Sequence, residues 1–139
     1  MIAIMFVERA AIQHAKIWLK ESLIRTFLVI NLLEFFTFLT LTIVTLNFFF
    51  VEFHSGYGLM FVVLSLEGFL FIKTKNKASR YILTGIAFAA LAALFFMNEI
   101  SPHKWFNYIS VSHVLMAISA TFFYIGTTKI DMSVIKKEV

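Results

Sequence analysis

Residues 27–51 read FLVINLLEFFTFLTLTIVTLNFFFV, an apolar stretch that contains one carboxylate, Glu34, and no Lys or Arg. About 20 consecutive apolar residues are enough for an α-helix to cross the hydrocarbon core of a bilayer. The stretch is continuously apolar, whereas a strand of a membrane β-barrel alternates apolar and polar residues. It therefore predicts a transmembrane helix.

The composition of the whole chain agrees with this prediction. Of its 139 residues, 60% are hydrophobic and 14% are charged, and the mean hydropathy is +0.88. Soluble domains have roughly 25% charged residues, and so apolar a chain cannot cover the surface of a small soluble domain with polar groups. The composition excludes a disordered chain and a water-soluble globular domain, and it predicts an integral membrane protein.

Three more apolar runs, 57–72, 81–97 and 106–126, follow the first one. Together they predict an all-α protein with a four-helix transmembrane bundle over residues 27–126. Four short helices enclose little volume, so we expect a homo-oligomer. Gly85, Ala89 and Ala93 recur every four residues and allow close helix approach. That approach takes place either within one chain or between copies.

The basic side chains are distributed unevenly about these runs. Of the 12 Lys and Arg residues, only Lys104 lies between the third and fourth runs, and the others lie before the first, between the second and third, or after the fourth. The positive-inside rule then predicts that both termini are cytoplasmic. We interpret the net charge of +4 as a consequence of this topology and not as a sign of nucleic-acid binding. The short loops favour a bacterial inner membrane.

Residues 1–26 predict an amphipathic helix that lies in the membrane interface. Polar side chains recur there at helical spacing, at Arg9, Gln13, Lys16 and Lys20. Such a helix places its apolar face, here with Trp18, against the bilayer. Two alternatives are an extension of the first span into the cytosol and packing of the apolar start against a partner subunit. Residues 127–139 are predicted to be a cytoplasmic tail.

Two carboxylates are predicted to lie within the membrane. Glu34 lies about seven residues into the first span, and Glu67 lies six residues before Lys73. At 1.5 Å per residue both are roughly 10 Å below the inner surface, so antiparallel neighbouring helices would bring them together. An ionised carboxylate in hydrocarbon is costly unless it is paired, protonated or hydrated. We therefore expect the two to form one proton-binding or cation-binding pair.

Polar neighbours extend this candidate site. Asn31 lies one helical turn before Glu34, Ser65 lies close to Glu67, and His113 lies within the fourth span. Because histidine titrates near pH 6.5, His113 would suit a proton relay on the outer side. The alternative is that each of these groups only forms a structural hydrogen bond with a neighbouring helix.

Three histidines, His54, His103 and His113, are predicted to share the outer side. Imidazole and carboxylate groups suit zinc and other divalent ions, so these histidines are a candidate metal site. The chain has no cysteine, which excludes thiolate ligands and disulfides. The alternative is that the histidines lie in loops at the headgroup interface and bind nothing.

The functional hypothesis is a small membrane transport or conduction protein with no resident cofactor. In it the intramembrane carboxylates would bind a proton or a cation. One alternative is a membrane-embedded enzyme that acts on a lipid-like substrate with zinc or another divalent metal at the histidine site. Another is a non-catalytic subunit of a larger membrane complex. The sequence does not favour an enzyme, because no Ser–His–Asp or Cys–His set is evident.

Overall fold

The computed structural model describes residues 1–130, and this part of the chain is helical with no β-strand. It contains four helices that are long and apolar enough to cross a membrane: Glu21–Thr45, Phe49–Thr74, Lys77–Met97 and Tyr108–Thr128. The prediction of an all-α protein with four such helices is confirmed. Most of the predicted tail, 127–139, lies outside the described residues.

The first apolar run contains a turn as well as a helix. Helix α2 (Glu21–Thr45) begins six residues earlier than the predicted span, and it ends where Leu46 takes a left-handed conformation with φ of 50°. The Asn47 side chain then accepts a hydrogen bond of 2.9 Å from the backbone N–H of Phe49. Such a bond satisfies a backbone donor at a helix start. The predicted continuous span over 27–51 is therefore wrong at its end.

The second membrane-length helix has three parts. Helix α3 (Phe49–Tyr57) continues into η2 (Gly58–Val63), a π-helical segment, and then into α4 (Leu64–Thr74). The segment that the sequence predicted to be an outer loop, with His54, is therefore helical. Single π-helical turns inside α-helices occur frequently at functional sites.

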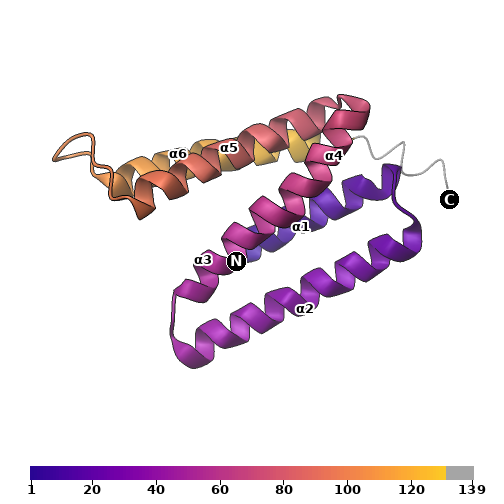
Figure 1. Ribbon diagram of the computed structural model, residues 1–139, viewed down its shortest axis with the longest axis horizontal. Helices are drawn as coiled ribbons and strands as arrows, with labels where there is room; N and C mark the ends of the chain where they lie inside the picture. The colour runs from indigo at the N-terminus through magenta and orange to yellow at the C-terminus, as the bar shows by residue number, and fades with distance from the viewer. Residues whose placement is uncertain (131–139) are drawn as a thin grey trace. The chain divides into compact units, whose positions relative to one another are not determined.

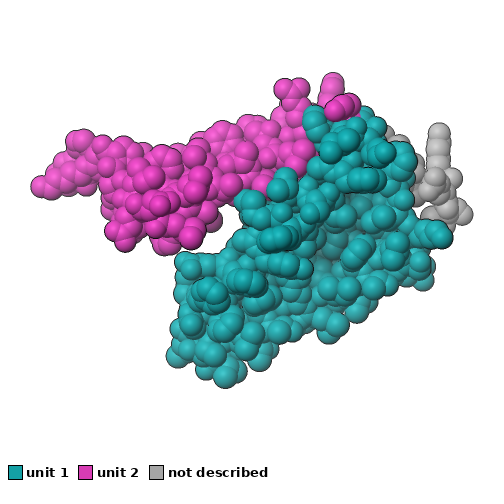
Figure 2. Space-filling view, in the orientation of Figure 1, with its two compact units in different colours: residues 1–74, 130–139 teal, residues 75–129 magenta. Residues whose placement is uncertain are grey.

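The described chain divides into two compact units (Figure 2). Unit 1 contains Met1–Thr74 and Ile130, and unit 2 contains Lys75–Lys129. In unit 1, helix α1 (Ile2–His14) and the 3-10 turn η1 (Ala15–Ile17) pack along α2 and against η2 and α4 (Figure 1). A cluster of buried apolar side chains lies at this junction: Ile12, Ala15, Ile24 and Leu70.

Helix α1 differs from the interfacial amphipathic helix that the sequence predicted. Its charged or titratable side chains Glu8 and His14 are completely buried within unit 1. The basic stripe was a misleading signal, because the face that decides the packing is the small and apolar one around Ala11 and Ala15. This burial places two titratable groups of α1 among the helices of unit 1.

Unit 2 is a pair of helices, α5 (Lys77–Met97) and α6 (Tyr108–Thr128). The Ser119 hydroxyl donates a hydrogen bond of 2.7 Å to the backbone oxygen of Gly85, and a Cβ at Gly85 would lie 2.9 Å from the Phe123 ring. The close approach at Gly85 therefore occurs within one chain. Ala92 is buried in the contact whereas Ala93 is exposed, so the predicted small-residue row is only partly the contact face.

Candidate metal centre

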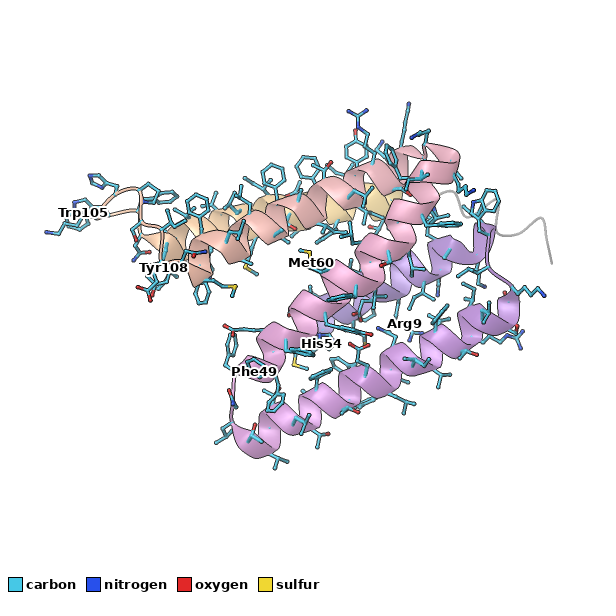
Figure 3. All side chains as sticks on the ribbon, in the orientation of Figure 1. Arg9, Phe49, His54, Met60, Trp105 and Tyr108 are labelled. Carbon is cyan, nitrogen blue, oxygen red and sulfur yellow. The ribbon has the colours of Figure 1, made fainter. Side chains whose placement is uncertain are left out.

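Three helices of unit 1 bring together Glu8 from α1, Glu34 from α2 and His54 from α3, which we name the triad. One oxygen from each carboxylate and one nitrogen of the imidazole lie within 4.8 Å of one another. Glu8 and His54 are fully buried, and Glu34 is partly buried. Figure 3 shows His54 directed from α3 toward α2. The triad is a possible ligand set for a metal ion.

Two neighbours position the Glu8 carboxylate. The Asn31 side-chain N–H donates a hydrogen bond of 2.5 Å to Glu8 Oε2. At Gly58, the first residue of the π-helical segment, a Cβ would overlap the Glu8 carboxylate and would lie 2.9 Å from Ile4. Gly58 therefore provides the space that Glu8 occupies, and Asn31 orients the carboxylate. These contacts leave Glu8 Oε1 directed to no protein partner among the described residues.

The His54 ring packs against two phenylalanine rings. It lies edge-to-face with Phe35 and Phe38 of α2, at centroid distances of 6.3 and 5.6 Å. Within residues 1–130 neither ring nitrogen has a hydrogen-bond partner, and Glu34 Oε1 has none either. A buried polar group without a partner costs about 1–3 kcal/mol, so native proteins rarely leave one without a ligand, ion or water.

The charge of Glu8 reflects the same surroundings. The pKa of the Glu8 carboxyl is raised from its ordinary value of 4.5 to about 7, mainly by burial and secondly by the charge of Glu34, while the hydrogen bond from Asn31 lowers it. Near neutral pH the two carboxylates therefore compete for one proton unless a cation lies between them.

The ligand types suit a divalent metal ion. Zinc binds carboxylate oxygen and imidazole nitrogen at about 2.0–2.2 Å, usually with four ligands, so neighbouring ligand atoms lie roughly 3.4 Å apart. The atoms of the triad, at separations of up to 4.8 Å, need only a modest inward movement to reach that geometry. Three protein ligands leave one position open for water or a substrate.

A groove between α2 and α3 is lined in part by Glu34, which lies midway along the α2 wall. Its volume is about 410 Å³, and its other lining residues are Ile30, Leu33, Thr37, Phe38, Phe53 and Tyr57. The groove is open to the surroundings of unit 1, because Leu33 is 63% exposed and Phe53 is 49% exposed. It gives an apolar approach to the one member of the triad that is only partly buried.

A protein-family model matches residues 1–132, and it describes a family of unknown function, DUF6962. The chain belongs to this family. The match includes all three residues of the triad. Searches of curated proteins and of solved structures give no match.

The expected pairing of Glu34 with Glu67 is wrong. Both Glu67 oxygens lie close to His14 Nδ1, at 3.0 and 3.1 Å, and both side chains are fully buried. Glu67 lies 13 residues beyond His54 on one continuous helix, which is about 20 Å at 1.5 Å per residue. Helix α1 runs alongside and supplies a different partner to each carboxylate, Glu8 for Glu34 and His14 for Glu67.

The other predicted site residues have separate positions. Ser65 is exposed on α4. In unit 2, His103 is exposed and its Nδ1 accepts a hydrogen bond of 3.2 Å from the backbone N–H of Trp105. His113 is also exposed, and its Nδ1 lies 2.7 Å from the backbone oxygen of Ile109. The predicted metal set of His54, His103 and His113 thus has members in both units and stays a prediction.

Sequence reasoning found Asn31, Glu34 and His54 but missed Glu8, His14 and Gly58. Glu8 and His14 lie in the segment 1–26 that was predicted to be an interfacial helix, and neither was predicted to belong to a site. The available signal was the segment AAIQHA over residues 10–15, whose small side chains permit close packing of helices. Gly58 is the second residue of the predicted run 57–72, and the sequence contains no comparable signal for it.

Proposed function

We propose that this chain is a membrane-embedded enzyme that binds a divalent metal ion at Glu8, Glu34 and His54 and hydrolyses a lipid-like substrate. The observation that carries the proposal is the convergence of three ligand groups from three helices, each with an atom that no described protein group satisfies. The four apolar helices and the distribution of Lys and Arg favour a bacterial inner-membrane protein with cytoplasmic termini.

The charge of the triad supports a metal ion. Among the described residues no Lys or Arg forms an ion pair with Glu8 or Glu34. The adjacent Arg9 instead lies 3.4 Å from the backbone oxygen of Leu28. Buried carboxylates need a positive partner or a proton, and a divalent ion supplies the charge for both.

The chemistry follows from the open coordination position. A metal ion lowers the pKa of a bound water to about 7 and polarises a carbonyl group. In hydrolysis the water oxygen bonds to the acyl carbon, the bond from that carbon to the leaving oxygen or nitrogen breaks, and the water proton passes to the leaving group. The reaction needs no oxidant or reductant.

Metal analysis of the full chain, purified after growth with zinc and measured by mass spectrometry, tests the proposal. We expect about one metal ion per chain, and a loss of at least tenfold in Glu8→Gln and in His54→Ala. Glu21→Gln is the matched control, because Glu21 is exposed at the start of α2 and pairs with Lys16. A metal-free wild-type protein, or equal metal content in all four proteins, would overturn the proposal.

Proton or cation conduction by a homo-oligomer is the second candidate. It is favoured by the arrangement of two carboxylates in one centre, one partly exposed and one fully buried, since intramembrane carboxylates commonly mark ion pathways. It predicts cation flux in reconstituted vesicles that Glu34→Gln abolishes. Flux that the variant leaves unchanged, or the absence of flux in wild-type vesicles, would eliminate this candidate.

A further inference from the structure

The groove beside Glu34 has a mostly apolar lining. Apart from Glu34, its polar side-chain groups are the hydroxyls of Tyr57 and of Thr37, and the Thr37 hydroxyl donates a hydrogen bond of 2.8 Å to the backbone oxygen of Leu33. A water-soluble ligand in this groove would therefore leave its own polar groups without partners, which is costly. The lining favours a hydrocarbon.

One wall of the groove comes from Phe53 and Tyr57 of α3, and beyond the groove Phe61 of η2 continues the row of rings. Phe53 and Tyr57 stack with a centroid distance of 6.4 Å and nearly parallel planes, and Tyr57 stacks in turn on Phe61 at 5.8 Å. The opposite wall comes from α2, with Ile30 and Leu33. Stacked rings at successive helical turns form a flat, continuous strip, which suits an extended flexible chain better than a bulky side chain of another protein.

We propose that the groove holds one acyl chain of a membrane lipid and that the carbonyl group of this chain lies at Glu34, beside the triad. This proposal rests on the proposed function and names its substrate class, an acyl ester or acyl amide of a lipid. If a methylene takes roughly the 30 Å³ that liquid water takes per molecule, a groove of about 410 Å³ has room for about a dozen methylenes.

The physical role of the groove is orientation. A lipid chain is already in an apolar medium before it enters, so its entry brings little hydrophobic gain of the kind that drives binding from water. The walls instead hold the carbonyl group against the metal centre, and correct placement of reacting groups is a large part of catalysis. A long acyl chain is therefore processed faster than a short one that cannot fill the groove.

The test uses full-length, zinc-loaded protein in lipid nanodiscs with two fluorogenic esters of the same alcohol, one with a short and one with a long acyl chain. The variant is Leu33→Trp, which fills the groove. The matched control is Leu32→Trp, because Leu32 is 43% exposed on the same helix and does not line the groove. Metal content is measured in every protein.

We expect Leu33→Trp to lower kcat/KM for the long-chain ester about tenfold, with the short-chain ester changed less than about twofold and the metal content unchanged. Leu32→Trp should resemble the wild type with both esters. Equal effects of Leu33→Trp on the two esters, or no effect on either, would overturn the groove assignment while the metal centre stands.

A photoactivatable fatty acid provides a second readout that does not need activity. We expect it to label peptides that contain Phe53 and Tyr57 in the wild type and to label them about tenfold less in Leu33→Trp, in line with the loss expected for the long-chain ester. If the wild type contains no metal and hydrolyses nothing, the proposed function fails, and this labelling still decides the groove. Uniform labelling of all exposed helices would overturn the acyl-chain site.

Discussion

Unit 1 contains two buried polar clusters, and both join helix α1 to the rest of the unit. In the first, His14 of α1 bonds Glu67 of α4 through a single ring nitrogen and both carboxylate oxygens. In the second, Glu8, Glu34 and His54 converge, yet among described residues Glu8 Oε1, Glu34 Oε1 and both His54 nitrogens have no hydrogen-bond partner. Four of the five titratable side chains in the two clusters are fully buried and Glu34 is partly buried, but only the first cluster has its polar atoms paired within the described part of the protein.

This difference separates a structural role from a ligand-binding role. A buried ion pair with good geometry holds two helices together, and the removal of one partner is costly. A buried set of unpartnered groups reduces stability until a ligand satisfies it, and such costs are concentrated at functional sites. Four predictions test the distinction, from the largest expected effect to the smallest.

Glu67→Ala should lower the free energy of unfolding by about 3–5 kcal/mol, because it leaves His14 in a buried site without the carboxylate that it contacts. Titration of the purified protein from mild detergent into sodium dodecyl sulfate, followed by circular dichroism, measures the change. Glu52→Ala is the control, since Glu52 is exposed on α3. A Glu67 variant as stable as this control would show that the pair does not hold α1.

Gly58→Ala should weaken metal binding about 10–100-fold, the range found when the support of a metal ligand is lost. The added methyl group would overlap the Glu8 carboxylate and displace one ligand. Competition with a chromophoric chelator measures the affinity. Gly56→Ala is the matched control, because a Cβ there has no heavy atom within 4 Å. Equal affinity in the two variants would contradict the role of Gly58.

Metal affinity should fall about tenfold for each pH unit below 7 and level off above it, because the proton and the metal ion compete for Glu8. The stability of the metal-free protein should change with pH in the opposite direction. The raised pKa of Glu8, about 7 against 4.5, means that the folded state binds more protons, so stability without metal falls as pH rises from 4.5 to 7. Glu8→Gln should remove the pH dependence of both metal affinity and stability. If either pH dependence persists in that variant, a group other than Glu8 causes it.

His54→Phe should raise the stability of the metal-free protein by about 1 kcal/mol, because it removes two unpartnered nitrogens and keeps the ring between Phe35 and Phe38. The same variant should lose its metal. In the same unfolding assay, His54→Phe would therefore raise the free energy of unfolding whereas Glu67→Ala would lower it. A loss of stability in His54→Phe would show that the imidazole is satisfied in the native protein, against the proposed centre.

Part of the candidate centre was predictable from the sequence. Asn31 and Glu34 lie one helical turn apart, and a carboxylate inside an apolar run is unusual enough to mark a site. Their real partners were not predictable in this way. Glu8 lies 26 residues before Glu34 in the chain, in a segment whose polar stripe predicted an interfacial helix, and His54 was assigned to a loop. Turn signals are local and brief. Asn47 is the only polar residue among the last six of the apolar run, so the sequence predicted one helix to continue through a position where the structure has a turn.

By itself the sequence determined that the chain forms four apolar helices of membrane length, because the cost of an unsatisfied backbone in hydrocarbon depends on the local run of side chains and on little else. It also determined that the apolar runs contain a few costly polar groups. Only the tertiary structure decided which of these groups meet. Which groups meet depends on where α1 packs. The small side chains and Gly58 allow this packing because of their size and shape, and a hydropathy pattern does not contain that information.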